Sequence, residues 1–87
     1  MTDELGALVH LLRNVPVREI IAALKRDGFV LERETRTGSR IYGHGDGRLT
    51  VIHYHRSSDT LTRKTLRSVL QATRWSEADL RRLKLLK

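Results

Sequence analysis

Two histidines that stand two residues apart are the side chains of this chain best suited to proton transfer. His53 and His55 belong to the run at residues 49–55, whose apolar alternation predicts a strand. Because side chains alternate between the faces of a strand, both imidazoles should lie on the same face as Val51. An imidazole has a reference pKa of about 6.5, so it takes up or releases a proton near neutral pH. The pair could act as general acid or base, or form a polar strand face without a chemical role.

Arg40 could supply a cation beside these histidines. It belongs to a second predicted strand at residues 39–44, and the glycine-rich segment that follows favours a hairpin turn about Asp46. If the two strands are neighbours, Arg40 should lie within a few side-chain widths of His53 or His55 on one open face. A guanidinium presents paired donors that match phosphate oxygens, but it stays protonated and cannot be a base. The residues therefore predict a phosphate clamp beside a proton-transfer group; the alternative is a solvated arginine.

Positive charge is concentrated in the last third of the chain. The formal net charge is +7, and residues 56–87 hold nine Lys and Arg against three Asp and Glu. Such a basic segment points to a polyanionic or acidic partner. We expect RNA to be bound by a basic set that comprises Arg40, Arg56, Arg63, Lys64, Arg67 and Arg74. The alternative is a basic surface that binds another protein.

The composition limits what the site could contain. The chain has 87 residues and no cysteine, which excludes a thiol nucleophile and a thiolate zinc site. We expect one domain over residues 1–87 with a modest core and no cofactor pocket. No carboxylate or third histidine stands at convincing spacing beside the histidine pair, so no metal site is expected. No apolar run approaches the about 20 residues that span a bilayer, and the acidic N-terminus is unlike a signal peptide, so we expect a cytoplasmic protein.

The elements that must position these residues follow from apolar spacing and turn residues. The expected elements are helices at 3–13 and 16–28, strands at 29–34, 39–44 and 49–55, a helix from 62 and a helix from 76. Pro16 suits the first turn of the second helix, and Gly28 its left-handed cap. Gly43, Gly45 and Gly47 should supply the positive φ values of the hairpin turn. The sequence predicts an α+β fold, a three-stranded antiparallel sheet with helices packed on one face. Its core is residues 16–75, with 1–14 as an extra N-terminal helix and 76–87 as a C-terminal helix.

Several short motifs resemble a known family. They are Gly38-Ser39, Ile41-Tyr42, Asp46-Gly47-Arg48, the strand that ends in His55, and Thr65-Leu66-Arg67-Ser68-Val69-Leu70. Together they resemble the HicA family, the small mRNA-cleaving toxins of bacterial toxin–antitoxin pairs, over residues 16–85. The resemblance implies a fold like that of double-stranded-RNA-binding domains, with an α-βββ-α core, and a metal-independent endoribonuclease (mRNA interferase). It also implies an acidic HicB-like antitoxin that covers the open sheet face or the basic helix surface.

The chain departs from this family at the catalytic position. The family's catalytic histidine follows Gly-Ser, and here that position is Arg40. His53 stands where the family's third strand usually has proline, and His55 falls on its frequent strand-end histidine. We hypothesise a catalytic set of His55, His53 and Arg40, in which proton transfer has moved to the third strand and Arg40 holds the scissile phosphate. The alternatives are a non-catalytic or inactivated HicA-like RNA-binding module and a basic protein-interaction domain.

Overall fold

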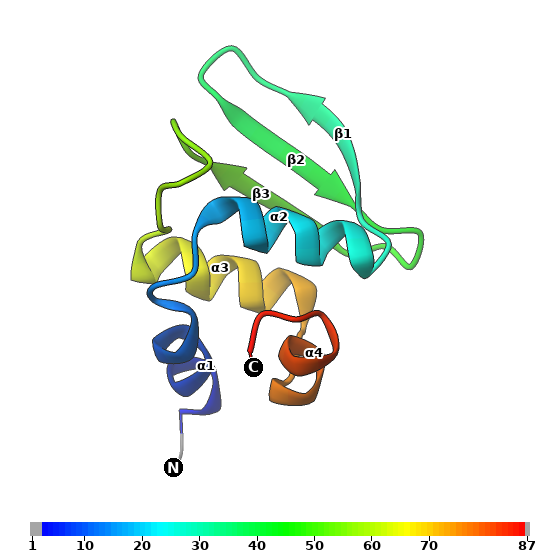
Figure 1. Ribbon diagram of the computed structural model, residues 1–87. Helices are drawn as coiled ribbons and strands as arrows, with labels where there is room; N and C mark the ends of the chain where they lie inside the picture. Colours follow the sequence, from blue (N-terminus) through cyan, green and yellow to red (C-terminus); the bar gives the residue numbers. More distant parts are fainter. Residues whose placement is uncertain (1–2, 87) are drawn as a thin grey trace.

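The computed structural model describes residues 3–86, which form helices and a small sheet (Figure 1). In chain order the elements are α1 (Glu4–Leu12), α2 (Val17–Arg26), β1 (Val30–Glu34), β2 (Ser39–Gly43), β3 (Leu49–His53), α3 (Arg63–Thr73) and α4 (Glu77–Arg82). The predicted order of two helices, three strands and two helices is confirmed, and the fold is α+β.

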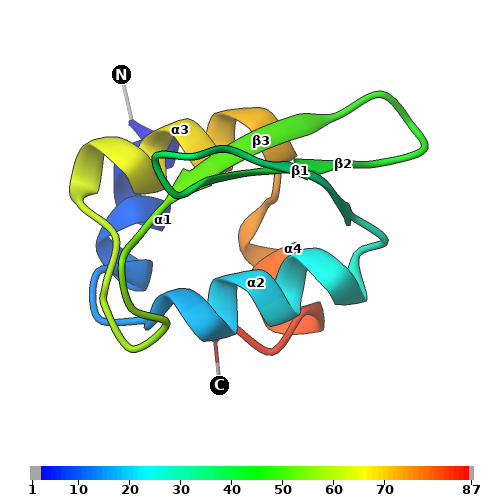
Figure 2. The same cartoon turned by 90° about the horizontal axis from the view of Figure 1, so that it is seen from above.

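The strands form one antiparallel sheet in the order β1-β2-β3, so the predicted three-stranded antiparallel sheet is confirmed. The helices gather on one side of this sheet, and Figure 2 shows α2 across the core from the strands. Tyr42 and Ile52 point toward the helices and are 3% and 0% exposed, whereas Leu49 and Val51 are 52% and 48% exposed. The sheet therefore has a covered face and an open face, as predicted.

The core lies between the covered face and the helices. Leu24 of α2 and Leu66 of α3 are 0% and 1% exposed, so the predicted helix faces are confirmed. The extra helix α1 packs against α3 through its own buried stripe. That stripe comprises Leu8, Val9 and Leu12.

Side-chain caps explain where the later helices begin. The Thr62 hydroxyl accepts a hydrogen bond from the Thr65 backbone N–H at 3.2 Å at the start of α3. Ser76 and Asp79 form the predicted capping box of α4. Gly28 has a φ of 101°, as expected of a residue that follows a helix in the left-handed conformation.

Pro16 lies outside the first turn of α2, contrary to the prediction. It is the N-cap, and its extended backbone, with a ψ of 153°, forms an isolated antiparallel bridge with Thr60. Next to this bridge, the Val17 N–H donates to the Asp59 carbonyl at 2.8 Å. These contacts fix the loop after β3 against the start of α2.

The hairpin turn uses its glycines differently from the prediction. Gly47 has a φ of 98°, but Gly43 and Gly45 have no positive φ. Gly43 instead leaves room for the Glu32 carboxylate, the end of an exposed side chain that a Cβ there would displace. Glycine thus serves two purposes here, a left-handed turn position and room for a neighbouring side chain.

The third strand ends at His53, two residues earlier than predicted. Its partner strand begins at Ser39, which pairs with His53, so β2 offers no further residue to pair with His55. The chain then bends, and the Asp59 carboxylate accepts the Arg56 N–H at 3.1 Å. His55 therefore lies in a loop just beyond the strand.

Candidate functional site

The register of β2 and β3 decides which candidate residues share a face. Ser39 pairs with His53, and Arg40 pairs with Ile52. Paired residues project on the same face of an antiparallel sheet, so His53 is on the open face and Arg40 is on the covered face. The prediction that Arg40 shares the open face with the histidines is wrong, because the hairpin pairs residues of the opposite parity.

His53 and His55 lie together as predicted, although His53 ends β3 and His55 belongs to the loop that follows. Their ring centroids are 5.3 Å apart in an edge-to-face arrangement, and both side chains are exposed. The His53 Nδ1 atom is 3.3 Å from the Ser39 hydroxyl oxygen. We call Ser39, His53 and His55 the histidine cluster. Sequence reasoning placed Ser39 in a motif but missed its contact with His53, which counting outward from the hairpin turn would have revealed.

An ordered turn lies on one side of this cluster and a small cavity on the other. Gly38 has a φ of 90°, which favours glycine in the turn before Ser39, and the Ser39 N–H donates to the Thr35 hydroxyl at 3.1 Å. On the other side, a cavity of about 170 Å³ separates the histidines from the first turn of α3. Its lining includes His53, His55 and Thr65. The cluster is thus exposed but placed on ordered backbone beside a small hollow.

Contacts with three other residues fix Arg40 on the covered face of the sheet. Its guanidinium is 2.9 Å from the Glu34 carboxylate and lies 4.2 Å from the centre of the Tyr54 ring. It also donates to the Gly38 carbonyl at 3.4 Å. The side chain is 25% exposed, so these contacts stabilise the turn that carries Ser39 rather than leave the guanidinium free.

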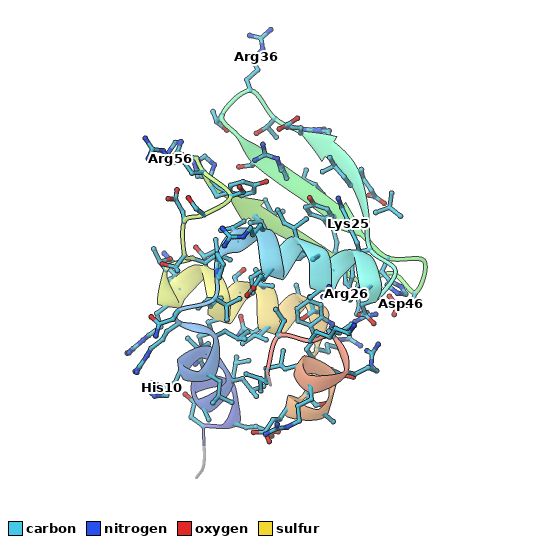
Figure 3. The ribbon with its side chains drawn as sticks, viewed as in Figure 1. His10, Lys25, Arg26, Arg36, Asp46 and Arg56 are labelled. Atoms are coloured by element: carbon cyan, nitrogen blue, oxygen red, sulfur yellow. The ribbon has the colours of Figure 1, made fainter. Side chains whose placement is uncertain are left out.

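The predicted basic set is divided among several places. Figure 3 shows Arg56 on the loop after β3, and it is exposed. Arg63, Lys64 and Arg67 lie together on the first two turns of α3. Arg74 caps the other end of that helix with a φ of 59°. The set therefore forms one cluster on α3 with Arg56 nearby in sequence, while Arg74 and Arg40 lie apart from it.

A second polar cluster lies at the other end of the hairpin. The Asp27 carboxylate is 3.0 Å from Arg48, 3.0 Å from Arg82 and 2.9 Å from the donating Trp75 Nε1. We call these four residues the Asp27 cluster. Burial alone would raise the pKa of Asp27, but the hydrogen bonds from Trp75 and Arg82 and the charge of Arg48 outweigh it, and the pKa is lowered.

His44 belongs to this second end and has a structural environment. Its Nε2 atom is 2.7 Å from the Asp27 carbonyl oxygen, and its Nδ1 atom accepts the Asp46 N–H at 3.0 Å. Since a carbonyl only accepts, Nε2 is the donor in the hydrogen bond to Asp27. His44 therefore anchors the hairpin turn to the end of α2.

Two further features bear on the class of site. Within residues 3–86, no three His, Asp or Glu side chains are grouped as a metal ion would require. None of the helices described for this part of the chain is long and apolar enough to cross a membrane.

Comparison with known proteins supports one family. Residues 17–75 match the family described as the HicA toxin of bacterial toxin–antitoxin systems, which leaves α1 and α4 outside the matched segment. No curated protein matches the chain. The match covers more than half of the chain and includes the sheet, α2 and α3. The chain belongs to the HicA toxin family.

Proposed function

We propose that this HicA-family protein is an endoribonuclease that binds and cleaves mRNA without a metal ion. The observation that carries the proposal is the histidine cluster, two exposed imidazoles in contact with one another, one of them bonded to Ser39. Two imidazoles supply both proton-transfer steps of RNA cleavage, because each can accept or donate a proton near neutral pH.

In this proposal His53 is the general base. When its Nδ1–H donates to the Ser39 hydroxyl, its Nε2 lone pair is free to take the proton of the ribose 2′-OH. The 2′-oxygen then attacks phosphorus, and the bond from phosphorus to the 5′-oxygen breaks. His55 donates a proton to that leaving oxygen. The products are a 2′,3′-cyclic phosphate and a free 5′-OH, with one proton taken up and one released.

The cation beside this reaction is Arg56 in our proposal, and Arg40 has a positioning role. Arg56 follows His55 directly, is exposed, and its guanidinium has no ion-pair partner within the described residues 3–86. Arg40 is engaged by Glu34 and the Gly38 carbonyl on the covered face. A guanidinium that is free to bind phosphate bidentately suits charge stabilisation better than one already paired.

The test is cleavage of a single-stranded mRNA in EDTA by the purified protein. His53→Ala and His55→Ala should each lower the cleavage rate by about 10²–10⁴-fold while circular dichroism stays unchanged. Val51→Thr, a change of an exposed side chain on the same face of β3, is the matched control. Cleavage that survives both histidine substitutions would refute the assignment.

One observation favours a second candidate function, a non-catalytic RNA-binding module. Arg40 occupies the position at which the family resemblance expects the catalytic imidazole, and Arg40 cannot transfer protons. If the wild-type protein is inert and Arg40→His switches on cleavage, the covered-face position is the catalytic one. The chain would then be a silenced HicA fold, and the histidine cluster would not be the active site.

The antitoxin partner that the family implies is, in our proposal, an acidic HicB-like protein on the open face. Leu49 and Val51 are about half exposed on that face, and His53 stands on the same strand and face. A protein that covers these apolar side chains would also block the histidine cluster. Leu49→Glu should weaken the complex, measured by calorimetry, and leave free-toxin cleavage unchanged.

A further inference from the structure

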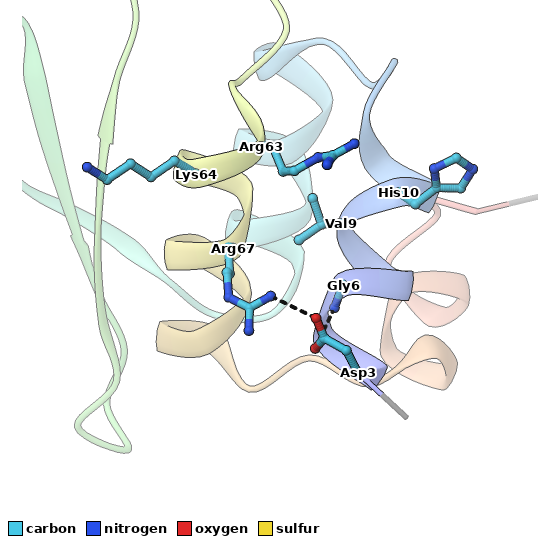
Figure 4. A pocket seen from close by; sticks show the side chains of 7 residues that line it. All are labelled: Asp3, Gly6, Val9, His10, Arg63, Lys64 and Arg67. Carbon is cyan, nitrogen blue, oxygen red and sulfur yellow. Dashed lines mark hydrogen bonds and ion pairs between the residues drawn. The ribbon is translucent and has the colours of Figure 1, made fainter. Parts of the chain in front are cut away.

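The extra helix α1 builds half of a groove against α3. The groove has a volume of about 690 Å³, and we call it the α1–α3 groove (Figure 4). Its lining comprises Asp3, Gly6, Val9, His10, Arg63, Lys64 and Arg67. The first four of these residues precede the segment 17–75 that matches the family. The groove is therefore a feature that α1 adds to the matched part of the fold.

Cations dominate the polar side of this groove. Figure 4 shows Arg63 pointing across the groove toward His10, and Arg67 pointing to Asp3. The Arg67 guanidinium is 3.2 Å from the Asp3 carboxylate, which is the one acidic side chain in the lining. In the described residues, the charged end of Arg63 has no acidic partner within ion-pair distance. The lining thus holds a surplus of positive charge around a cavity large enough for a nucleotide unit.

We infer that the α1–α3 groove is a second binding site for the phosphates of an RNA chain whose first contact is the histidine cluster. This inference rests on the proposed RNA-binding function. It predicts that the substrate is recognised as a polynucleotide, because one RNA strand has to occupy both the histidine cluster and the α1–α3 groove.

The first turn of α3 connects the two places. Thr65 lines the cavity beside His53 and His55, while Arg63 and Arg67 line the groove. Successive residues of an α-helix are about 100° apart around its axis, so Lys64 lies between those two flanks. Lys64 also lines the groove, although Figure 4 shows its side chain pointing away from α1. An RNA strand that leaves the histidine cluster and crosses the outer side of α3 would meet Lys64 and then Arg63 and Arg67.

Asp3 holds one of these cations until RNA arrives. Its carboxylate caps α1 by accepting the Gly6 N–H at 3.1 Å and binds Arg67 with the other oxygen. A Cβ at position 6 would lie 2.6 Å from that second oxygen, so glycine leaves room for the carboxylate to reach Arg67. A phosphodiester, whose one negative charge is shared by two oxygens, can replace an exposed carboxylate on a guanidinium. Asp3 therefore lowers the affinity of the groove for RNA.

The experiment is a salt titration of binding to a labelled, 2′-O-methylated single-stranded RNA, which lacks the nucleophile and is not cleaved. Asp3→Asn keeps an N-capping side chain and removes the charge, so binding should tighten and the log–log salt slope should steepen by about 0.7. Arg63→Ala should weaken binding and make the slope shallower by about the same amount. Glu77→Gln is the control. It removes the negative charge of another exposed ion pair, Glu77 with Arg81 at 3.5 Å, which lies outside the groove lining. Neither the RNA affinity nor the salt slope should change.

Gly6→Ala provides a second variant that keeps every charge. It should push the Asp3 carboxylate away from Arg67 and tighten RNA binding in the same direction as Asp3→Asn. If wild-type protein binds RNA but none of the groove variants changes affinity or slope, the groove inference is wrong and the proposed function stands. If wild-type protein does not bind RNA at all, both the groove inference and the proposed function are wrong. Unchanged RNA binding with loss of antitoxin binding in Arg63→Ala would make the groove a protein interface instead.

Discussion

Two polar clusters at opposite ends of the β2–β3 hairpin differ in how fully their side chains are paired. The Asp27 carboxylate is 9% exposed and receives donors from all three other members of its cluster. In the histidine cluster, His53 is exposed and its hydrogen bond to Ser39 is 3.3 Å long. The same hairpin therefore carries a saturated polar cluster at one end and an open one at the other.

The difference separates residues that hold the fold from residues that are free to bind. No buried side-chain nitrogen or oxygen in the described part of the chain lacks a hydrogen-bond partner. A buried polar group without a partner costs free energy, so saturation is expected wherever water is excluded. Donors and acceptors that remain unpaired at the exposed end cost little in water and stay available to a ligand. Charged groups at the Asp27 end should control stability, and those at the histidine end should control activity.

The largest expected effect is on stability, from Asp27→Ala. Removing the carboxylate takes the shared acceptor from Arg48 and the Trp75 N–H, and Arg48 keeps the Asp46 carboxylate, so the loss should be about 2–3 kcal/mol of unfolding free energy. Urea denaturation measures this loss. His53→Ala at the open end should change the same free energy by no more than about 0.5 kcal/mol. Equal losses at both ends would break the comparison.

Next in size is Arg48→Lys, which keeps the charge and removes the planar donor set. Arg48 binds the Asp27 carboxylate at 3.0 Å, the Asp46 carboxylate at 2.8 Å and the Thr73 carbonyl at 2.6 Å. One ammonium cannot bridge three acceptors in this arrangement, so we expect a loss of about 1–2 kcal/mol in the same denaturation assay. Arg36→Lys, at an exposed turn position, is the control and should be neutral.

Acid should act on the Asp27 end as well. An unfolded aspartate has a pKa of about 3.9, and the pKa of Asp27 in the folded state is lower. The stability that this group contributes is therefore present above the unfolded value and lost as the pH falls through the folded one. The unfolding free energies of wild type and Asp27→Ala, measured by denaturation at decreasing pH, should converge at low pH. Parallel curves would show that the carboxylate contributes nothing through its charge.

Much of the fold could be predicted because its signals are local. The capping box at Ser76, the left-handed residue Gly28 and the apolar spacing of α1 each lie within a few residues of the element they define. The Asp27 cluster could not be predicted in this way. Asp27 and Arg82 are 55 positions apart, and no periodic pattern relates two charges at that separation.

The candidate site could be predicted in part. Alternation predicted that His53 and His55 lie together, and their rings are in contact, although His55 lies in the loop just beyond the strand. The face of Arg40 depends on the register between two strands, and a shift of one residue reverses it. A turn centred on Asp46, as predicted, pairs Gly43 with Leu49, and counting outward from it gives the correct face of Arg40. The α1–α3 groove needed the packing of two helices that are distant in sequence.

The smallest expected effect sharpens the comparison at the open end, and it comes from Ser39→Ala. Ser39 does not touch the reacting atoms in our proposal, but its hydroxyl is 3.3 Å from the His53 Nδ1 atom and orients that ring. An ordinary hydrogen bond contributes about 0.5–1.5 kcal/mol, so kcat should fall by about two- to tenfold. Because the hydroxyl orients the ring and does not touch the RNA, kcat should fall while KM and the unfolding free energy stay unchanged. Ser39→Thr keeps the hydroxyl on a residue well suited to a strand and should restore the rate. A full loss of activity in both variants would indicate that Ser39 acts on the RNA directly.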